Sequence, residues 1–487
     1  MDIVLHPRAA ASDRIRVWIG AFQATHAPAL AWHLDGAAVT PVPLCAIRSV
    51  RPDSLLPTDR VPENQPRTFA GVYDFPGLAP DTLHTVTVQA DGILTRLETR
   101  TLPAQVPTLL SGTFNVLLVS CFHQHEDPRG LAGIIVSQLK ATAKPHLTLL
   151  MGDQVYLDLP TLQDFQDDAV WLARKFERDY TTNWQGSPGY SQVLAAAPSI
   201  SIPDDHEFWN NYPHPSPFIG NSLHPAGQQR WRQAALALYE GFQLPYPASL
   251  GAPTMIEVPP LSFFVADMRS QRDPGRQFTM AQEAYNAMGA WVSEVIDRKR
   301  FAVFVGGQSL FSKPADDLGG AIGDYELPNY ADYQPIMQQL QRLAEAARPA
   351  LCLTGDVHWG RMVAARDIRT QRIAFYEIIA SPASLVTTVG LDQVKAVGGF
   401  LGGLFGRPTP WPRHGDPSEP PDFLASEVFA GQFHCSTLHR QKGNHVALLS
   451  FSQTGGGMQF RVTYWPISRD STIGTPQEVG PFQLISL

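Results

Sequence analysis

The sequence predicts two domains: an all-β sandwich of the fibronectin or immunoglobulin type over residues 1–107, and an α/β domain over residues 108–487. Three observations lead to this prediction. Apolar and polar residues alternate with a period of two before residue 107. Strand and helix patterns alternate after residue 114, as in parallel sheets. Three apolar strands also end in acidic and imidazole side chains. A chain of 487 residues is too long for one typical domain, so two or three are expected.

The N-terminal region has the features of a β-sandwich. Residues 16–22 and 85–89 alternate as half-buried strands do. Residues 73–84 are similar to the Gly-Leu-x-Pro-x-Thr-x-Tyr signature of fibronectin type III sandwiches, with His84 in place of the tyrosine. Residues 99–103 read as the last strand, and a proline-containing linker follows to residue 107. We expect this domain to have a structural role without chemistry of its own.

The second domain begins with a strand–helix–strand unit. Strands are expected at 115–120, 147–151, 261–267 and 301–305, and also within 361–379 and 445–487. Helices are expected at 131–141, 161–180, 226–241, 279–298 and 338–348, with Thr279 capping the fourth. Residues 397–417 are rich in Gly and Pro, which predicts a long loop that could act as a lid. The triplet at 443–445 reads as a turn.

Composition and charge narrow the classes of partner. The chain is 44% hydrophobic and 17% charged, which is ordinary for a soluble globular protein. A formal net charge of −8 argues against nucleic acid or an anionic membrane as the main partner. The four cysteines lie far apart and are expected to be free thiols.

The N-terminus shows no pattern of a secretory signal or twin-arginine motif, and no apolar run of about 18 residues predicts a membrane span. We therefore expect a cytoplasmic protein as the chain is given. If a signal was removed, a periplasmic or secreted location is expected instead. The oligomeric state is not predicted.

Acidic and imidazole side chains follow three apolar strands. Asp153 and Tyr156 follow the strand at 147–151, and Asp204, Asp205 and His206 follow the strand at 199–202. Asp356 and His358 follow the strand at 351–354. Burying an unpaired carboxylate costs several kcal/mol, so a positive partner is expected. Ligands of open α/β sheets bind beyond the carboxyl ends of the strands. The three strand ends therefore predict a metal site.

The ligand types predict two different cations. Cys121, Tyr156 and His358 offer a thiolate, a phenolate and an imidazole, which together with a carboxylate favour iron or zinc. The phenolate suits ferric iron best. Asp153, Asp205 and Asp356 form an oxygen-only set that suits Ca²⁺, Mg²⁺ or Mn²⁺. Asp153 could bridge both ions. Two adjacent metals can clamp the attacking and leaving oxygens of a phosphoryl transfer.

The chain resembles the PhoD-like alkaline phosphatase and phosphodiesterase family, within the calcineurin-like metallophosphoesterase fold. The motifs that carry the resemblance occur in order over about 110–380, at 119–121, 152–156, 204–207 with 210–211, 266–269 and 355–358. The resemblance implies a four-layer α/β/β/α sandwich with a metal centre at one edge, holding Fe(III) and Ca(II), with Zn, Mn or Mg as alternatives. It implies that iron is bound by Cys121, Asp153, Tyr156 and His358, and the second cation by Asp153, Asp205 or Asn211, and Asp356.

The roles of several other residues stay open at this point. Common relatives of the fold carry Asp-x-His where this chain has Cys121-Phe-His123, so His123 is either a ligand or a hydrogen-bond partner of one. They also carry a histidine where this chain has Gly306-Gly-Gln308, and the loss of that imidazole supports an oxygen-rich second site. Asp204 is expected to hold a loop or orient His206. Glu207 is expected to be a local cap or an ion-pair partner.

Substrate binding is assigned to three residues near the motifs, and a fourth, Arg272, is left open. Arg269, Asn210 and Asn211 are predicted to contact the substrate phosphate. Arg269 and Arg272 could both grip a phosphate through two hydrogen bonds, and ion pairs at the surface are the alternative.

Three functions remain open from the sequence. The first is hydrolysis of phosphate mono- or diesters by a metal-activated hydroxide, with His206 protonating the leaving oxygen. The second is a phospholipase D-like phosphodiesterase acting on phospholipid-like or teichoic-acid-like diesters, in which the apolar residues 400–405 could contact an acyl chain. The third is a non-catalytic binding protein with a decayed metal site.

Overall fold

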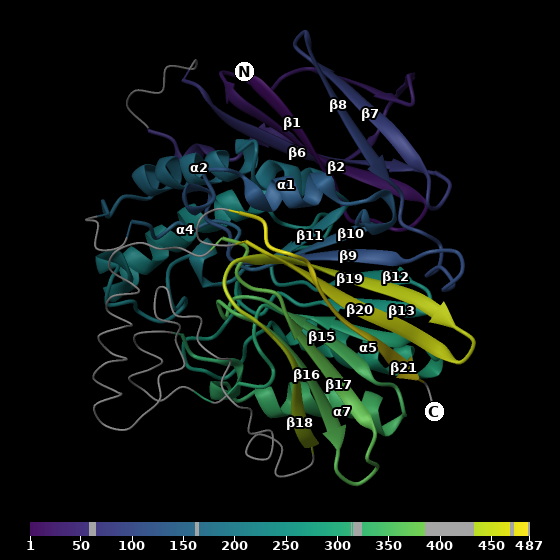
Figure 1. Ribbon diagram of the computed structural model, residues 1–487. Helices are drawn as coiled ribbons and strands as arrows, with labels where there is room; N and C mark the ends of the chain where they lie inside the picture. The colour runs from purple at the N-terminus through teal and green to yellow at the C-terminus, as the bar shows by residue number, and fades with distance from the viewer. Residues whose placement is uncertain are drawn as a thin grey trace.

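Two large β-sheets pack face to face, and helices cover both outer faces (Figure 1). The structure is a computed structural model that describes residues 1–57, 65–160, 165–312, 314, 324–384, 433–467 and 472–485. The layers follow the order helix, sheet, sheet, helix, which confirms the predicted α/β/β/α fold class. Within the described residues, no helix is both long and apolar enough to cross a membrane.

The first sheet has ten strands and runs through both predicted domains. Its middle strands β9, β10 and β11 are parallel to one another. They are buried along their whole length, which explains why they read in the sequence as continuous apolar runs. In spatial order the strands are β21 (Gln477–Ile485), β20 (Gly457–Pro466), β19 (His445–Thr454), β9 (Phe114–Val119), β10 (Leu147–Met151), β11 (Ser199–Ile202), β1 (Asp2–Arg8), β2 (Arg14–Ala24), β6 (Arg67–Pro76) and β5 (Val42–Ser49).

The second sheet has seven strands and also carries a parallel centre. Its strands in spatial order are β12 (Thr254–Val258), β13 (Leu261–Val265), β14 (Phe301–Val305), β15 (Ala350–Thr354), β17 (Ile373–Ile379), β16 (Gly360–Asp367) and β18 (Phe433–Gln441). Apolar side chains of both sheets, such as Leu149, Phe263 and Leu353, form one continuous core between them. This core fixes the positions of β9, β10 and β15 relative to one another. The positions of the polar residues that follow these strands depend on it.

The N-terminal region is all β, as predicted. Strands β3 (Leu30–Leu34), β4 (Ala37–Val39), β7 (Leu83–Ala90) and β8 (Ile93–Arg100) form a four-stranded sheet in the order β4-β3-β7-β8. It packs on the N-terminal strands of the ten-stranded sheet through a core that includes Ile19, Trp32 and Val86. Because β1 pairs in parallel with β11 at Arg8 and Ser199, the ten-stranded sheet is continuous across the predicted boundary at residue 107. That boundary stays a prediction.

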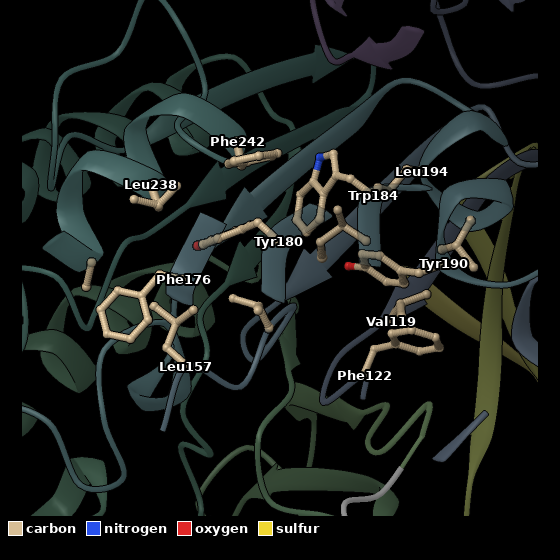
Figure 2. Packing of buried hydrophobic residues seen from close by; sticks show 14 of the residues in the cluster. Val119, Phe122, Leu157, Phe176, Tyr180, Trp184, Tyr190, Leu194, Leu238 and Phe242 are labelled. Carbon is tan, nitrogen blue, oxygen red and sulfur yellow. The ribbon is translucent and has the colours of Figure 1, made fainter. Parts of the chain in front are cut away.

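Helices α1 (Leu131–Gln138), α2 (Ala169–Gln185), α3 (Tyr190–Ala195) and α4 (Pro225–Phe242) cover the ten-stranded sheet. Figure 2 shows Tyr180 and Trp184 of α2 near Phe242 of α4, and Tyr190 of α3 lying over Phe122. The rings of Tyr180 and Phe242 stack with centroids 4.7 Å apart, and those of Tyr190 and Phe122 with centroids 4.5 Å apart. Phe122 directly follows Cys121, so this packing fixes the loop after β9.

Helices α5 (Gln282–Asp297) and α7 (Tyr333–Glu345) cover the seven-stranded sheet. The predicted cap of the first of these was wrong. Ala281 lies at the N-cap of α5 and makes no side-chain capping bond. The hydroxyl and backbone N–H of Thr279 instead donate to the carboxylate of Asp332, at 3.0 and 2.6 Å. Thr279 therefore binds a carboxylate far along the chain and does not cap α5.

The other helix predictions differ mainly in where they begin. The helix predicted at 338–348 begins earlier, at Tyr333, because Pro335 lies in its first turn, where proline costs no hydrogen bond. The helix predicted at 161–180 begins at Ala169, where the Asp168 carboxylate accepts the N–H of Trp171 at 2.7 Å. The predicted loop at 397–417 lies outside the described residues. Of the triplet at 443–445, Gly443 and Asn444 form a bend, in which Gly443 has a φ of 69°, and His445 begins β19.

Candidate metal centre

The polar residues singled out by the sequence meet at one edge of the two packed sheets. Each follows the carboxyl end of a parallel strand, which is where ligands bind in sheets of this kind. The ten-stranded sheet contributes residues after β9, β10 and β11, and the seven-stranded sheet contributes residues after β14 and β15. The side chains are those of Cys121, Asp153, Tyr156, Asp204, Asp205, His206, Gln308, Asp356 and His358.

The backbone is strained at this edge. Five residues there have left-handed φ values although none is glycine: Cys121 at 52°, Asp153 at 56°, Asn211 at 71°, Asp356 at 63° and His358 at 58°. Such a conformation costs about 1–3 kcal/mol for each residue and persists only where the surrounding structure imposes it. Strain of this kind clusters at functional sites, because it presents side chains that a relaxed turn would direct elsewhere.

Two glycines allow the strand ends to approach closely. A Cβ on Gly355 would lie 2.2 Å from the Met151 carbonyl oxygen and 2.6 Å from the Cβ of Ser120. A Cβ on Gly307 would lie 2.3 Å from a carboxylate oxygen of Asp204. A larger residue at position 355 would therefore press on the backbone of the facing sheet, and one at position 307 would displace the Asp204 carboxylate.

The first cluster surrounds the Oδ2 atom of Asp153. Ligand atoms of Cys121, Asp153 and His358 all lie within 4.8 Å of one another. The Cys121 thiol and the Tyr156 hydroxyl each lie 3.4 Å from Oδ2, and the Ser381 hydroxyl donates to the Cys121 sulfur at 3.1 Å. The four residues predicted to bind iron are therefore together in the structure.

The second cluster lies on the other side of Asp153. Carboxylate oxygens of Asp204, Asp205 and Asp356 lie within 4.8 Å of one another, and so do ligand atoms of Asp153, Asp205 and His206. The backbone N–H of His206 donates to Asp153 Oδ1 at 3.3 Å. Asp153 thus belongs to both clusters, one oxygen facing each, which is the arrangement expected of a bridging carboxylate.

The electrostatics of the clusters call for bound cations. Burial, followed by the charges of neighbouring carboxylates, raises the pKa of both Asp153 and Asp356 well above the ordinary value. Burial also raises the pKa of the Cys121 thiol and of the Tyr156 phenol. A bound cation reverses this balance by favouring the charged forms. The donor sets fit: a thiol, a phenol and an imidazole suit iron or zinc, and the carboxylate cluster suits a hard cation.

Arg269 is buried and already engaged by protein groups. Its guanidinium forms ion pairs with Asp204 and with Asp324, the latter at 2.5 Å, and donates to the Tyr212 carbonyl at 2.7 Å. Arg272 lies 3.5 Å from Asp324. Both arginines form ion pairs, and these pairs are buried and not at the surface. They fix the chain after β13 beside the acidic cluster.

His206 is held by a carboxylate that sequence reasoning missed. Its Nδ1 lies 2.8 and 2.9 Å from the two carboxylate oxygens of Asp158, and the Asn210 N–H donates to Asp158 Oδ2 at 2.8 Å. Burial opposes ionisation of Asp158, but the charge and hydrogen bond of His206 outweigh it and lower the Asp158 pKa. The sequence did offer a signal for this residue: Asp158 is a second carboxyl group five residues after Asp153, within a mostly apolar segment.

The structure also places Asn211, Asn210 and His123. The Asn211 N–H donates to Asp205 Oδ2 at 2.6 Å, which puts Asn211 beside the acidic cluster. The Asn210 amide nitrogen is buried and has no acceptor among the described residues. His123 belongs to none of the ligand groups found in the described part of the chain. Its ring lies 5.7 Å from that of Tyr156, which favours the role of a neighbour of a ligand.

Glu207 links the ends of β10 and β11. Its carboxylate accepts the backbone N–H groups of Asp153, Gln154 and Asp204 at 3.0, 2.6 and 2.8 Å, and the side-chain amide of Gln243 at 3.0 Å. Burial raises its pKa to about 7. The prediction of a local cap is confirmed, and the cap also reaches the turn that carries Asp153.

Comparison with known proteins agrees with this geometry. No protein-family model matches the chain, and no curated protein matches it. A solved structure of PhoD matches with a TM-score of 0.58 at 12% identity, over 98% of this chain and 92% of that one. The purple acid phosphatase PPD1 from yellow lupin (Lupinus luteus) seeds matches with a TM-score of 0.57 at 10% identity, over 98% of this chain and 74% of that one. This chain shares the fold of these two structures. The PhoD-like resemblance drawn from the motifs is thereby confirmed at the level of the fold.

Replacing Glu207 with Ala should lower the free energy of unfolding by about 3 kcal/mol or more, because it leaves three buried N–H groups without an acceptor at about 1–3 kcal/mol each. Urea unfolding monitored by tryptophan fluorescence measures this loss. The matched control is Glu283→Ala on the exposed surface of α5, which should stay within about 0.5 kcal/mol of the parent. Equal values for the two variants would show that Glu207 does not hold the strand ends.

Proposed function

We propose that this chain hydrolyses phosphate esters at a centre of two cations, as an alkaline phosphatase or phosphodiesterase of the PhoD type. The observation that carries the proposal is the meeting of two ligand clusters at the two oxygens of Asp153. The shared fold supports it, because both solved structures that match over 98% of the chain are described as PhoD and as a purple acid phosphatase.

The residues assign a different cation to each cluster. Cys121, Asp153, Tyr156 and His358 would hold Fe(III), because thiolate, phenolate and imidazole donors suit it. Asp153, Asp205 and Asp356 would hold Ca(II), with the Asn211 carboxamide as a further oxygen donor. Zn, Mn and Mg remain the alternative ions. When bound at such a site, the cations supply Lewis acidity and an activated water for attack at phosphorus.

His206 is the proposed general acid. Because Asp158 binds Nδ1, the proton to be transferred is held at Nε2 on the opposite side of the ring. The buried Asp158 carboxylate stabilises the imidazolium and fixes the orientation of the ring. The Tyr156 ring packs on His206 with centroids 4.3 Å apart and limits its movement. His206 can therefore deliver its proton to a leaving oxygen from a fixed position.

Substrate contacts are proposed for Asn210, Asn211 and Arg269. The buried Asn210 amide nitrogen lacks an acceptor among the described residues, and a phosphate oxygen would provide one. Asn211 lies beside Asp205 at the edge of the acidic cluster. The Arg269 guanidinium lies 3.9 Å from Asp356 Oδ2, so its charge reaches the place where phosphate would bind. Its pairs with Asp204 and Asp324 keep it in that position.

The other two predicted functions have less support. The phospholipid-like diester substrate was predicted from residues 400–405, which lie outside the described residues, so it stays a prediction. A decayed binding protein would not be expected to retain five strained backbone positions and two complete ligand clusters at one edge. Turnover of a chromogenic phosphate monoester, compared with that of the matching diester, tests which ester class is preferred.

Removal of metal should abolish hydrolysis and lower Tm, because the buried carboxylates lose the cations that balance them. A ligand present at 100 times its Kd adds about 2.7 kcal/mol to stability, and chelation removes this amount. The measurement is turnover and thermal unfolding before and after chelation, with metal loss confirmed by elemental analysis and with restoration by added Fe and Ca. Unchanged turnover in metal-free protein would contradict the proposal.

Replacing His206 with Ala should lower kcat by roughly 10²–10⁴-fold, the usual range for general acid catalysis. The loss should shrink for aryl esters with acidic leaving groups, because these depart without a proton. The matched control is His26→Ala, on the exposed surface of the N-terminal sandwich, which should leave kcat unchanged. A loss that is the same for acidic and basic leaving groups would point instead to positioning or metal retention.

Ferric iron bound by a thiolate and a phenolate should make the purified protein visibly coloured, whereas zinc, with its filled d shell, should not. Tyr156→Phe should shift or bleach the visible band, and Cys121→Ser should lower the iron content. Cys45→Ser, at a half-buried thiol on β5, is the control and should change neither. Full iron occupancy with an unchanged spectrum in both site variants would show that neither side chain is a ligand.

A further inference from the structure

Gln308 occupies a fixed position between the two sheets. It follows β14, and the loop that carries it is held by the buried carboxylate of Glu377. This carboxylate accepts the Ser309 hydroxyl at 3.0 Å and the Leu310 N–H at 2.8 Å. Glu377 is in turn paired with buried Arg361 at 2.7 Å. Gln308 itself is only 2% exposed, so its side chain has little freedom to leave the acidic cluster.

The two ends of the Gln308 amide have different environments. Its nitrogen donates to Asp356 Oδ2 at 3.0 Å and to Asp204 Oδ2 at 3.1 Å. Its oxygen is buried and has no donor among the described residues. A buried acceptor without a partner costs about 1–3 kcal/mol. The NH₂ group therefore takes the place of a positive ion between two carboxylates, while the oxygen of the same amide is left without a partner.

Rotation of the amide about its last torsion exchanges these two atoms. That torsion is broad and roughly two-fold, so the exchange needs no movement of the loop. With a cation between the carboxylates, the oxygen would face the ion and the orphaned acceptor would acquire a partner. A carboxamide oxygen is a hard donor that adds a ligand without adding negative charge. This matters beside Asp204, Asp205 and Asp356, because three carboxylates already lie within 4.8 Å of one another there.

We propose that Gln308 is a ligand of the second cation through its Oε1 atom, and that it makes this site select Ca²⁺ over zinc. The inference rests on the second cation site of the proposed function and adds to it the residue that sets metal preference. An imidazole at this position would favour zinc, since nitrogen donors suit it and Ca²⁺ takes oxygen ligands. Gln308 touches Asp204 and Asp356 but none of the ligands unique to the iron cluster, so iron binding should not depend on it.

The test compares Ca²⁺ and Zn²⁺ binding to iron-loaded, calcium-depleted full-length protein by titration calorimetry, with iron content measured in the same samples. Gln308→Leu should bind Ca²⁺ roughly 10–100-fold more weakly, the range for loss of a group that supports a metal site. Gln308→His should weaken Ca²⁺ binding and strengthen Zn²⁺ binding at least tenfold. Gln282→Leu, at an exposed position of α5, is the matched control and should alter neither affinity.

The outcomes distinguish failure of this inference from failure of the proposed phosphoesterase function. Retained iron in the Gln308 variants shows that the fold and the first cluster are intact. Ca²⁺ affinity unchanged in Gln308→Leu, in a protein whose parent binds Ca²⁺, would overturn the role of Gln308 and leave the proposed phosphoesterase standing. A parent protein that binds neither iron nor Ca²⁺ and hydrolyses no ester would overturn the proposed function together with the inference.

Discussion

Repulsion among buried carboxylates is the constraint around which this edge of the protein is built. Asp153, Asp204 and Asp205 are buried and lie beside the half-buried Asp356, and burial with mutual repulsion raises the pKa of Asp153 and Asp356. Arg269 offsets part of this repulsion, and two other features hold the acids in place despite it. Arg269 pairs with Asp204, the carboxylate of Glu207 holds two strand ends by their N–H groups, and left-handed backbone conformations fix the acids in place.

The sequence predicted the features that follow from strand chemistry. An apolar run ending in an acid predicts a buried parallel strand, and parallel strands necessarily share the edge at which their carboxyl ends lie. That reasoning brought Cys121, Asp153 and His358 together from segments more than 200 residues apart. It did not find the pairing of Asp158 with His206, because contacts between neighbouring loops depend on how the turns pack. The start of α5 was missed for a similar reason, since the acceptor of Thr279 is a residue far along the chain.

The N-terminal sandwich contacts elements that carry the site, which its own sequence did not predict. Strand β1 pairs with β11, the strand that leads into Asp205 and His206. Trp18 of β2 donates its indole N–H to the Gly241 carbonyl at 2.8 Å, and Arg8 of β1 binds the Phe242 carbonyl, both at the end of α4. The N-terminal sandwich therefore contacts both the strand that leads into the site and the end of α4. These contacts position β11 and the turn after it, which carries Asp205 and His206.

The two clusters differ in chemistry because each is assembled across both sheets from different strand ends. The thiol after β9 and the imidazole after β15 lie on one side of Asp153, and the carboxylates after β11 lie on the other. The turn after β15 serves both, since Asp356 faces the acidic cluster while His358, two residues later, faces Cys121. Asp356 and His358 both have left-handed backbone conformations, which persist only where the surrounding structure imposes them. The strained turn after β15 therefore directs one side chain into each cluster, which is how a single short segment serves two sites of different chemistry.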